Sequence, residues 1–144
     1  MPEGFLYPIV FLPCRDLEVV RSFYNGILGL ELVLDQGSCL IFQVGACGSG
    51  GYWGFCSGGK SELIDPKNVC LTLVVASREE VDEWYKRLTK LNVTCTKPPS
   101  YTAQFHIYNA FFRDPTNYTI EIQVFDADHA PSRDTHAVVS NAND

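Results

Sequence analysis

Glu121 stands out among the chain's ionisable residues because of the side chains that alternate with it. It lies in the run Thr119 to Val124 (TIEIQV), in which polar and apolar residues alternate. This period of two is typical of a β-strand with one face toward a core, so Thr119, Glu121 and Gln123 would share the other face. A carboxylate there can act as a base, bind a cation or ligate a metal. Alternatively, the three polar side chains are only the solvated face of a half-exposed strand.

The cysteines form a second group of reactive side chains. There are six, with no Cys-x-x-Cys pair and no histidine at zinc-finger spacing: Cys14, Cys39, Cys47, Cys56, Cys70 and Cys95. The N-terminus carries Glu3 rather than a basic targeting segment, and no apolar run reaches membrane length. We therefore expect free thiols, a cytoplasmic location and no membrane partner.

Composition restricts the partners further. The chain has 11 basic and 17 acidic residues, a net charge of −6, and is 46% hydrophobic. Such an acidic surface repels phosphate backbones, which argues against a nucleic-acid partner. The apolar content suffices for one core, which we expect within residues 1–125, whereas residues 126–144 read as a polar, flexible tail.

Two helices are predicted from apolar spacing, and the second repeats the first. One starts at Asp16, a plausible N-cap, and ends at Gly29; the other starts 61 residues later at Ser77, which forms a capping box with Glu80. The apolar positions coincide after that shift: Val20 with Val81, Phe23 with Trp84, Tyr24 with Tyr85, Ile27 with Leu88, and Leu30 with Leu91.

Each predicted helix follows one strand and precedes three. The leading strands are 7–14 and 68–75, and the later ones are 30–34, 38–44 and 51–57 in the first half and 93–96, 105–113 and 118–125 in the second. This pattern predicts an α+β fold of two paired βαβββ modules. Module one would span 5–57, a linker 58–67, and module two 68–125.

Two stretches resemble the signature segments of the vicinal-oxygen-chelate superfamily, which includes glyoxalases, bleomycin resistance proteins and extradiol dioxygenases. They are DLEVVRSFYNGILGLEL (16–32) and FFRDPTNYTIEIQVF (111–125), within a similarity that covers about 5–125. Asn117 stands where the family usually has glycine. The resemblance implies a curled mixed sheet that forms a half-barrel cleft, with the helices outside and often in a homodimer.

The same resemblance identifies the positions of metal ligands, on the first and last strands of each module. These positions hold Ile9, Cys70 and Glu121, and the last strand of module one contains no Asp, Glu or His. Ile9 cannot bind a metal, so we expect no catalytic metal. The alternative is a divalent ion held by Glu121, Cys70 and His106.

Strand alternation predicts a cleft with one apolar and one polar wall, which suits a small amphipathic organic molecule. The predicted ligand-binding residues are Tyr7, Ile9, Phe11, Trp53, Cys70, Thr72, His106, Thr119, Glu121 and Gln123. Glu121 would face apolar groups without a cation, which should raise its pKa. Replacing it with Gln should then leave the fold as stable or slightly more so.

Two classes of function remain open. One is a metal-independent protein that binds and sequesters a small molecule, with the acidic surface favouring a cationic ligand. The other is an enzyme: a metal-dependent lyase or dioxygenase that uses Glu121 with Cys70 or His106, or an enzyme in which Glu121 alone is the catalytic base. Fold cannot decide between them, because this fold supports both.

Overall fold

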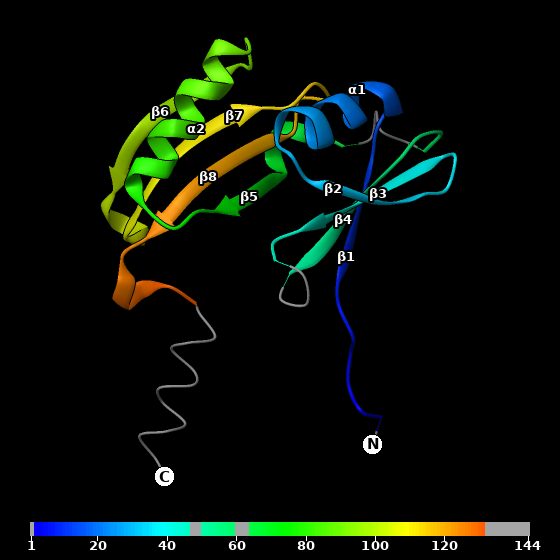
Figure 1. Cartoon of the computed structure of the whole chain (residues 1–144), viewed down its shortest axis with the longest axis horizontal. Helices are drawn as coiled ribbons and strands as arrows, with labels where there is room; N and C mark the ends of the chain where they lie inside the picture. Colours follow the sequence, from blue (N-terminus) through cyan, green and yellow to red (C-terminus); the bar gives the residue numbers. More distant parts are fainter. Residues whose placement is uncertain (1, 47–49, 60–63, 132–144) are drawn as a thin grey trace. The chain divides into compact units, whose positions relative to one another are not determined.

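Strands and helices follow the predicted order twice in a computed structural model, which describes residues 2–46, 50–59 and 64–131 (Figure 1). The first repeat consists of β1 (Ile9–Pro13), α1 (Leu17–Arg21), η1 (Ser22–Ile27), β2 (Glu31–Asp35), β3 (Cys39–Val44) and β4 (Gly51–Cys56). After η3 (Pro66–Asn68), the second consists of β5 (Cys70–Val74), α2 (Arg78–Lys90), β6 (Cys95–Thr102), η4 (Ala103–Phe105), β7 (Ile107–Arg113) and β8 (Thr119–Phe125). A last turn, η5 (Ala127–His129), follows β8. The predicted α+β fold of two βαβββ modules is confirmed.

Each repeat forms one open four-stranded sheet, in the order β1-β4-β3-β2 and β5-β8-β7-β6. The chain divides into two compact units. Unit one contains the described residues up to Leu71 and also Arg113–Thr119; unit two contains Thr72–Phe112 and the described residues from Ile120 onward. The β7–β8 turn thus belongs to the first unit although it lies in the second repeat. Part of the predicted linker, residues 60–63, lies outside the described residues.

Aromatic side chains form the core of unit one, between the first helical segment and its sheet. The Tyr24 ring lies 4.4 Å from that of Phe55 and 5.9 Å from that of Phe42, measured between ring centroids. Trp53 is also buried and meets Tyr24 edge-on at 6.2 Å. These contacts seat the helical segment on one face of the sheet and leave the opposite face to Ile9 and Phe11.

The β7–β8 turn is fastened to this core by a buried hydrogen bond. The Tyr24 hydroxyl donates to Asp114 Oδ2 at 2.6 Å, and the Tyr118 hydroxyl donates to the carbonyl oxygen of Pro13. The Asp114 carboxylate also accepts from the backbone N–H groups of Thr116 and Tyr118. Burial raises the pKa of Asp114, although the hydrogen bonds that its carboxylate accepts from Tyr24, Thr116 and the backbone of Tyr118 oppose the shift. Asn117 adopts a left-handed φ of 77°, as its place in the predicted turn requires.

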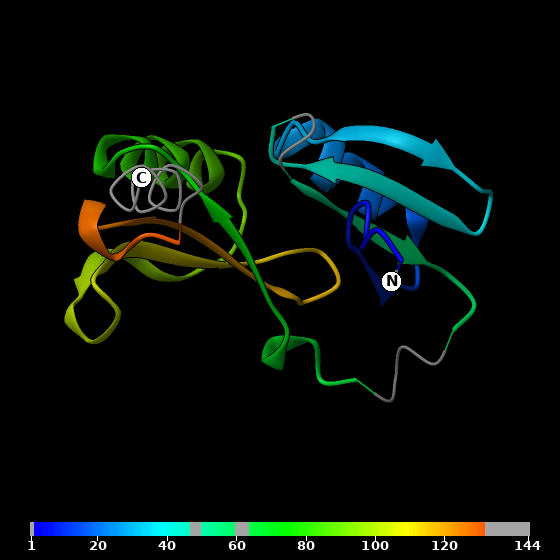
Figure 2. The same ribbon diagram turned by 90° about the horizontal axis from the view of Figure 1, so that it is seen from below.

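Helix α2 covers one face of the second sheet, as Figure 2 also shows. Its side chains Val81 and Leu88 are buried, together with Ile120 and Ile122 on β8. Ser77 caps the helix by accepting from the N–H of Glu80, while the Glu80 carboxylate accepts from the N–H of Ala76. None of the described helices combines the length and the apolarity needed to cross a membrane.

Local structure departs from the predictions in two places. The first helix continues as a π-helical segment, η1, in which the N–H of Leu28 bonds to the carbonyl of Phe23 five residues earlier. Strand β6 continues through Pro98 and Pro99, which the prediction had placed beyond its end. Because β6 is an edge strand and its register shifts between Lys97 and Ser100, the prolines remove no ladder hydrogen bond.

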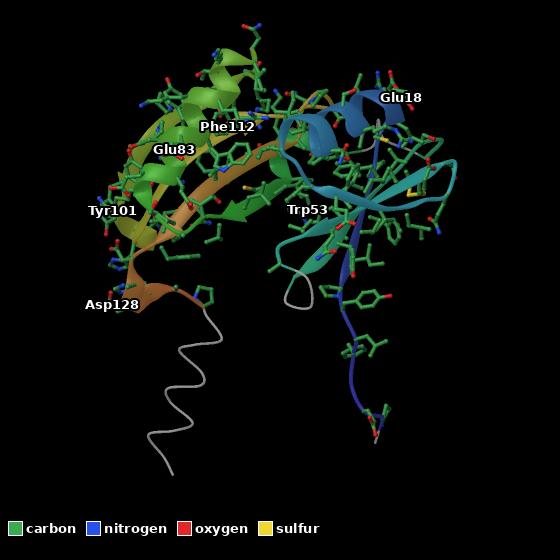
Figure 3. All side chains as sticks on the ribbon, viewed as in Figure 1. Glu18, Trp53, Glu83, Tyr101, Phe112 and Asp128 are labelled. Carbon is green, nitrogen blue, oxygen red and sulfur yellow. A yellow bond between two sulfur atoms is a disulfide. The ribbon has the colours of Figure 1, made fainter. Side chains whose placement is uncertain are left out.

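The expectation that all cysteines are free thiols is wrong. Cys39 and Cys56 face each other on β3 and β4 and form a disulfide, whose yellow bond appears in Figure 3. Cys14 and Cys95 are free thiols, and burial raises the pKa of both. Cys47 lies outside the described residues. Since one pair is oxidised, the cysteines no longer support a reducing compartment.

Candidate functional site

Glu121 lies in the middle of β8 and is 7% exposed, so the solvated-face alternative does not hold for it. Its Oε1 accepts hydrogen bonds from the Thr72 hydroxyl at 2.7 Å and the Gln123 amide at 3.2 Å. Its Oε2 accepts from the Asn109 amide at 2.8 Å. Three neutral donors therefore stabilise the buried carboxylate, which keeps its desolvation cost low.

A cation is connected to this carboxylate through Asn109. The Lys97 ammonium donates to the side-chain and backbone oxygens of Asn109, and Thr102 donates to the same side-chain oxygen at 2.9 Å. Burial lowers the pKa of Lys97, and the negative charge of Glu121 partly offsets that effect. The expectation that Glu121 lacks a cation is therefore wrong: Lys97 and Asn109 supply a relay of charge-assisted hydrogen bonds.

One polar atom of this face has no partner. Gln123 is 7% exposed, and its Oε1 is buried without a hydrogen bond among the described residues. The amide orientation is fixed, because a flip would point Oε1 at the carboxylate oxygen of Glu121 that its nitrogen now contacts. The result is an acceptor that faces neither solvent nor a protein donor.

Equivalent backbone hydrogen bonds identify the position in unit one that corresponds to Glu121. Tyr52 donates to Pro8 as Thr119 donates to Val69, and Cys14 donates to Cys56 as Val75 donates to Gln123. Glu121 lies midway between Thr119 and Gln123, as Gly54 lies midway between Tyr52 and Cys56. Gly54 is therefore its counterpart, and Ile9 and Cys70 both open the first strand of their repeats, as predicted.

The residues at the family's metal-ligand positions do not fit a metal. Ile9 is aliphatic, and a side chain at Gly54 is excluded because a Cβ there would lie 2.5 Å from the Phe11 ring. Thr72, Asn109 and Gln123 already donate to the Glu121 carboxylate, and the corresponding positions Ile9 and Gly54 offer no ligand atom to complete a metal site with it. We therefore derive no chemistry through a metal at these positions.

The remaining predicted site residues are distributed unevenly. Tyr7, Ile9 and Phe11 are exposed, and the first two line an apolar pocket of about 230 Å³ in unit one with Val33, Leu34, Ile41 and Tyr52. Trp53 packs against Tyr24 on the helix side of its sheet, and its role in ligand binding stays a prediction.

Residues predicted in the second repeat also differ in their surroundings. Thr119 donates to the Lys67 carbonyl at 2.8 Å and accepts from Arg113, a structural arrangement. Cys70 is exposed. His106 lies in the turn before β7, where its near neighbours include Asp126 and His129. His106 groups with Asp126 and His129 within the described ranges, and the alternative ligand set of Cys70, His106 and Glu121 stays a prediction.

Sequence reasoning missed Lys97 and Asn109. Asn109 lies within the predicted strand 105–113, and alternation alone puts it on one face with Ile107 and Phe111. A polar side chain between two large apolar ones was therefore the available signal. Lys97 had no such signal, because its approach depends on the continuation of β6 beyond the predicted end.

Comparison with known proteins agrees with this architecture. Residues 7–122 match the family model described as Glyoxalase/Bleomycin resistance protein/Dioxygenase superfamily. A glyoxalase/bleomycin resistance protein/dioxygenase from Nocardioides has a TM-score of 0.70 at 19% identity, over 92% of this chain and 91% of that one. No curated protein matches the chain.

Two further solved structures share the fold. The genomically encoded fosfomycin resistance protein FosX from Listeria monocytogenes has a TM-score of 0.67 at 22% identity, over 90% of this chain and 98% of that one. Lactoylglutathione lyase from Agrobacterium tumefaciens has a TM-score of 0.66 at 21% identity, over 86% and 95%. At these identities the similarity establishes the fold alone.

Proposed function

Because the chain belongs to the glyoxalase/bleomycin resistance protein/dioxygenase superfamily, we propose that it binds a small amphipathic organic molecule without a catalytic metal. The binding surface is the polar sheet face of unit two around Glu121 and Gln123. In this role the protein sequesters its ligand rather than transforming it.

The unpaired Oε1 of Gln123 carries this proposal. A buried acceptor without a donor costs about 1–3 kcal/mol, and native folds rarely retain one. A ligand with an N–H or O–H group would remove this cost once the groups that cover Oε1 in the free protein move aside. The ligand class is therefore one that presents at least one hydrogen-bond donor to the sheet.

Charge favours a cationic ligand over an anionic one. Lys97 donates to Asn109, and the whole chain carries a net charge of −6. An anion would approach against both the Glu121 carboxylate and the overall field. A cation with amide or amine donors would be attracted by the negative charge and could donate a hydrogen bond to Oε1 of Gln123.

Metal-free bleomycin, a cationic molecule with many N–H donors, is a suitable probe for isothermal titration. We expect wild type to bind it and Glu121→Gln to bind about 1–3 kcal/mol more weakly, the usual cost of losing a charged hydrogen-bond partner. Glu83→Gln is the matched control, since it removes the same charge from the exposed surface of α2 and should leave affinity unchanged.

Fosfomycin, a small anion, serves as the opposite probe and should not bind. Unchanged bleomycin affinity in Glu121→Gln, or a preference for fosfomycin, would contradict the proposal.

Glu121→Gln should also lower the free energy of unfolding by about 1 kcal/mol. Its amide N–H groups would face the three donors that the carboxylate now accepts from. This replaces the expectation, drawn from sequence, of equal or greater stability.

A further inference from the structure

Two of the chain's three histidines lie against each other in unit two. The imidazole rings of His106 and His129 are stacked, with centroids 3.8 Å apart and planes inclined by 15°. Asp126 completes the group, and the nearest ligand atoms of the three side chains all lie within 4.8 Å of one another. Within residues 2–46, 50–59 and 64–131, no other three His, Cys, Asp or Glu side chains come together in this way.

Backbone contacts hold the three residues in place. The N–H of Asp126 donates to the carbonyl of His106 at 2.9 Å, and the N–H of His129 donates to the carbonyl of Asp126 at 2.9 Å. His106 itself has a φ of 55°, a left-handed conformation that non-glycine residues adopt rarely and mostly at specialised turns. The contact between η5 and the turn before β7 therefore fixes the spacing of the two histidines.

The carboxylate of Asp126 is oriented by neighbours that would form an outer shell. The Tyr101 hydroxyl donates to Oδ2 of Asp126 at 2.7 Å, and the Arg78 guanidinium lies 3.4 Å from Oδ1 of Asp126. Figure 3 labels Tyr101, and also Asp128, which lies two residues after Asp126 in the chain. Each carboxylate oxygen of Asp126 accepts one of these contacts and keeps a further lone pair for a metal ion.

We propose that His106, Asp126 and His129 bind one divalent transition-metal ion of the zinc type. Two imidazole nitrogens and a carboxylate oxygen are a donor set that suits zinc, with water in the remaining position. Because zinc bonds are about 2.0–2.2 Å long, the ligand atoms of the three side chains must move closer to one another when the ion binds. His129 is exposed in a short turn, so its ring can rotate out of the stack. Bound metal would clamp η5 to the turn before β7.

This site is separate from the proposed ligand-binding face. It uses neither Glu121 nor any other position at which the family resemblance predicts a metal ligand. Loss of one site should therefore leave the other intact, and the two proposals can fail independently.

The test is a zinc titration of the metal-stripped full chain by calorimetry, with bound metal counted by mass spectrometry. We expect one zinc per chain in wild type and in His136→Gln, which changes the third histidine and lies outside the described residues. His106→Asn keeps a residue that tolerates the left-handed turn, and His129→Gln removes the second imidazole. Each should weaken zinc binding by at least about tenfold.

Glu121→Gln should bind zinc like wild type. The proposal is overturned if wild type binds no zinc at micromolar concentrations, if His106→Asn and His129→Gln bind as wild type does, or if Glu121→Gln abolishes binding. Imidazole ¹⁵N resonances of wild type provide a readout that does not depend on variant folding. Zinc should shift the signals of two histidines and leave the third unchanged.

Discussion

Glu121 and Gln123 are next-but-one neighbours on β8 with opposite hydrogen-bonding balance. The carboxylate receives three donors, whereas the Oε1 of the amide receives none. A structural network would be expected to satisfy both groups. The imbalance makes Gln123 the residue whose replacement best separates stability from ligand binding.

Gln123→Met should have opposite effects on these two properties. It deletes the unpaired acceptor, worth about 1–3 kcal/mol, and loses one hydrogen bond to Glu121, worth about 0.5–1.5 kcal/mol. We expect urea unfolding to give an unchanged or slightly higher stability without ligand, and calorimetry to give weaker bleomycin binding. Gln36→Met, on the exposed first hairpin, should alter neither. A clear loss of stability in Gln123→Met would make the amide a structural element.

At this scale, the sequence predicted the direction of Glu121 but not its partners. Alternation with Ile120 and Ile122 was enough to place the carboxylate on the face away from α2. The hydrogen bond from Thr72 joins residues 49 positions apart, and that from Asn109 depends on the register of β7 against β8, so no local pattern encodes them. The disulfide between Cys39 and Cys56 was missed for the same reason, because it depends on the register of β3 against β4.

Among the secondary-structure elements, the turn between β7 and β8 contains a buried carboxyl group whose titration couples stability to pH. Its Asp114 carboxyl has a pKa raised by burial, so the folded state holds the proton more tightly than the unfolded chain, whose Asp pKa is about 3.9. The contribution of Asp114 to stability is therefore greatest at low pH. This contribution falls as pH rises from about 4 through the raised pKa of Asp114 in the folded state. At higher pH the contribution is constant.

Asp114→Asn removes this titration and keeps most of the turn. The amide oxygen can still accept from the N–H groups of Thr116 and Tyr118, and the amide nitrogen can donate to the hydroxyl oxygen of Tyr24. Urea unfolding at a series of pH values should show the stability of wild type relative to Asp114→Asn declining as pH rises from 4. A difference that grows with pH would reverse the sign of the argument.

Elements with a clear period were predicted within a few residues, and those governed by tertiary context were not. Helix α2 follows from its cap at Ser77 and its apolar spacing. Strand β6 was predicted to end at Thr96, yet it continues through Pro98 and Pro99, which an edge position and a register shift accommodate. Residues from Phe105 to His106 were assigned to a strand, whereas His106 adopts a left-handed turn.

The whole molecule is expected to be a homodimer. Large apolar side chains are exposed on the N-terminal segment and the edge strand β1, including Phe5, Tyr7, Val10 and Phe11. Exposed apolar groups beside an unpaired strand edge favour association with a second chain. Sedimentation velocity at tens of micromolar should show a dimer, and Phe5→Lys with Val10→Lys should shift it toward monomer. A monomeric wild type under these conditions would contradict the prediction.

The hydrogen bond between Tyr24 and Asp114 joins residues that are 90 positions apart in the chain. The β7–β8 turn completes the first unit, yet it leaves the ribosome only after most of the second unit has been made. At a synthesis rate of about 5–20 residues per second, Asp114 is added to the chain roughly 5–20 s after Tyr24. The first repeat is translated first, yet the contacts that Arg113–Thr119 add to its unit can form only after that turn has been synthesised.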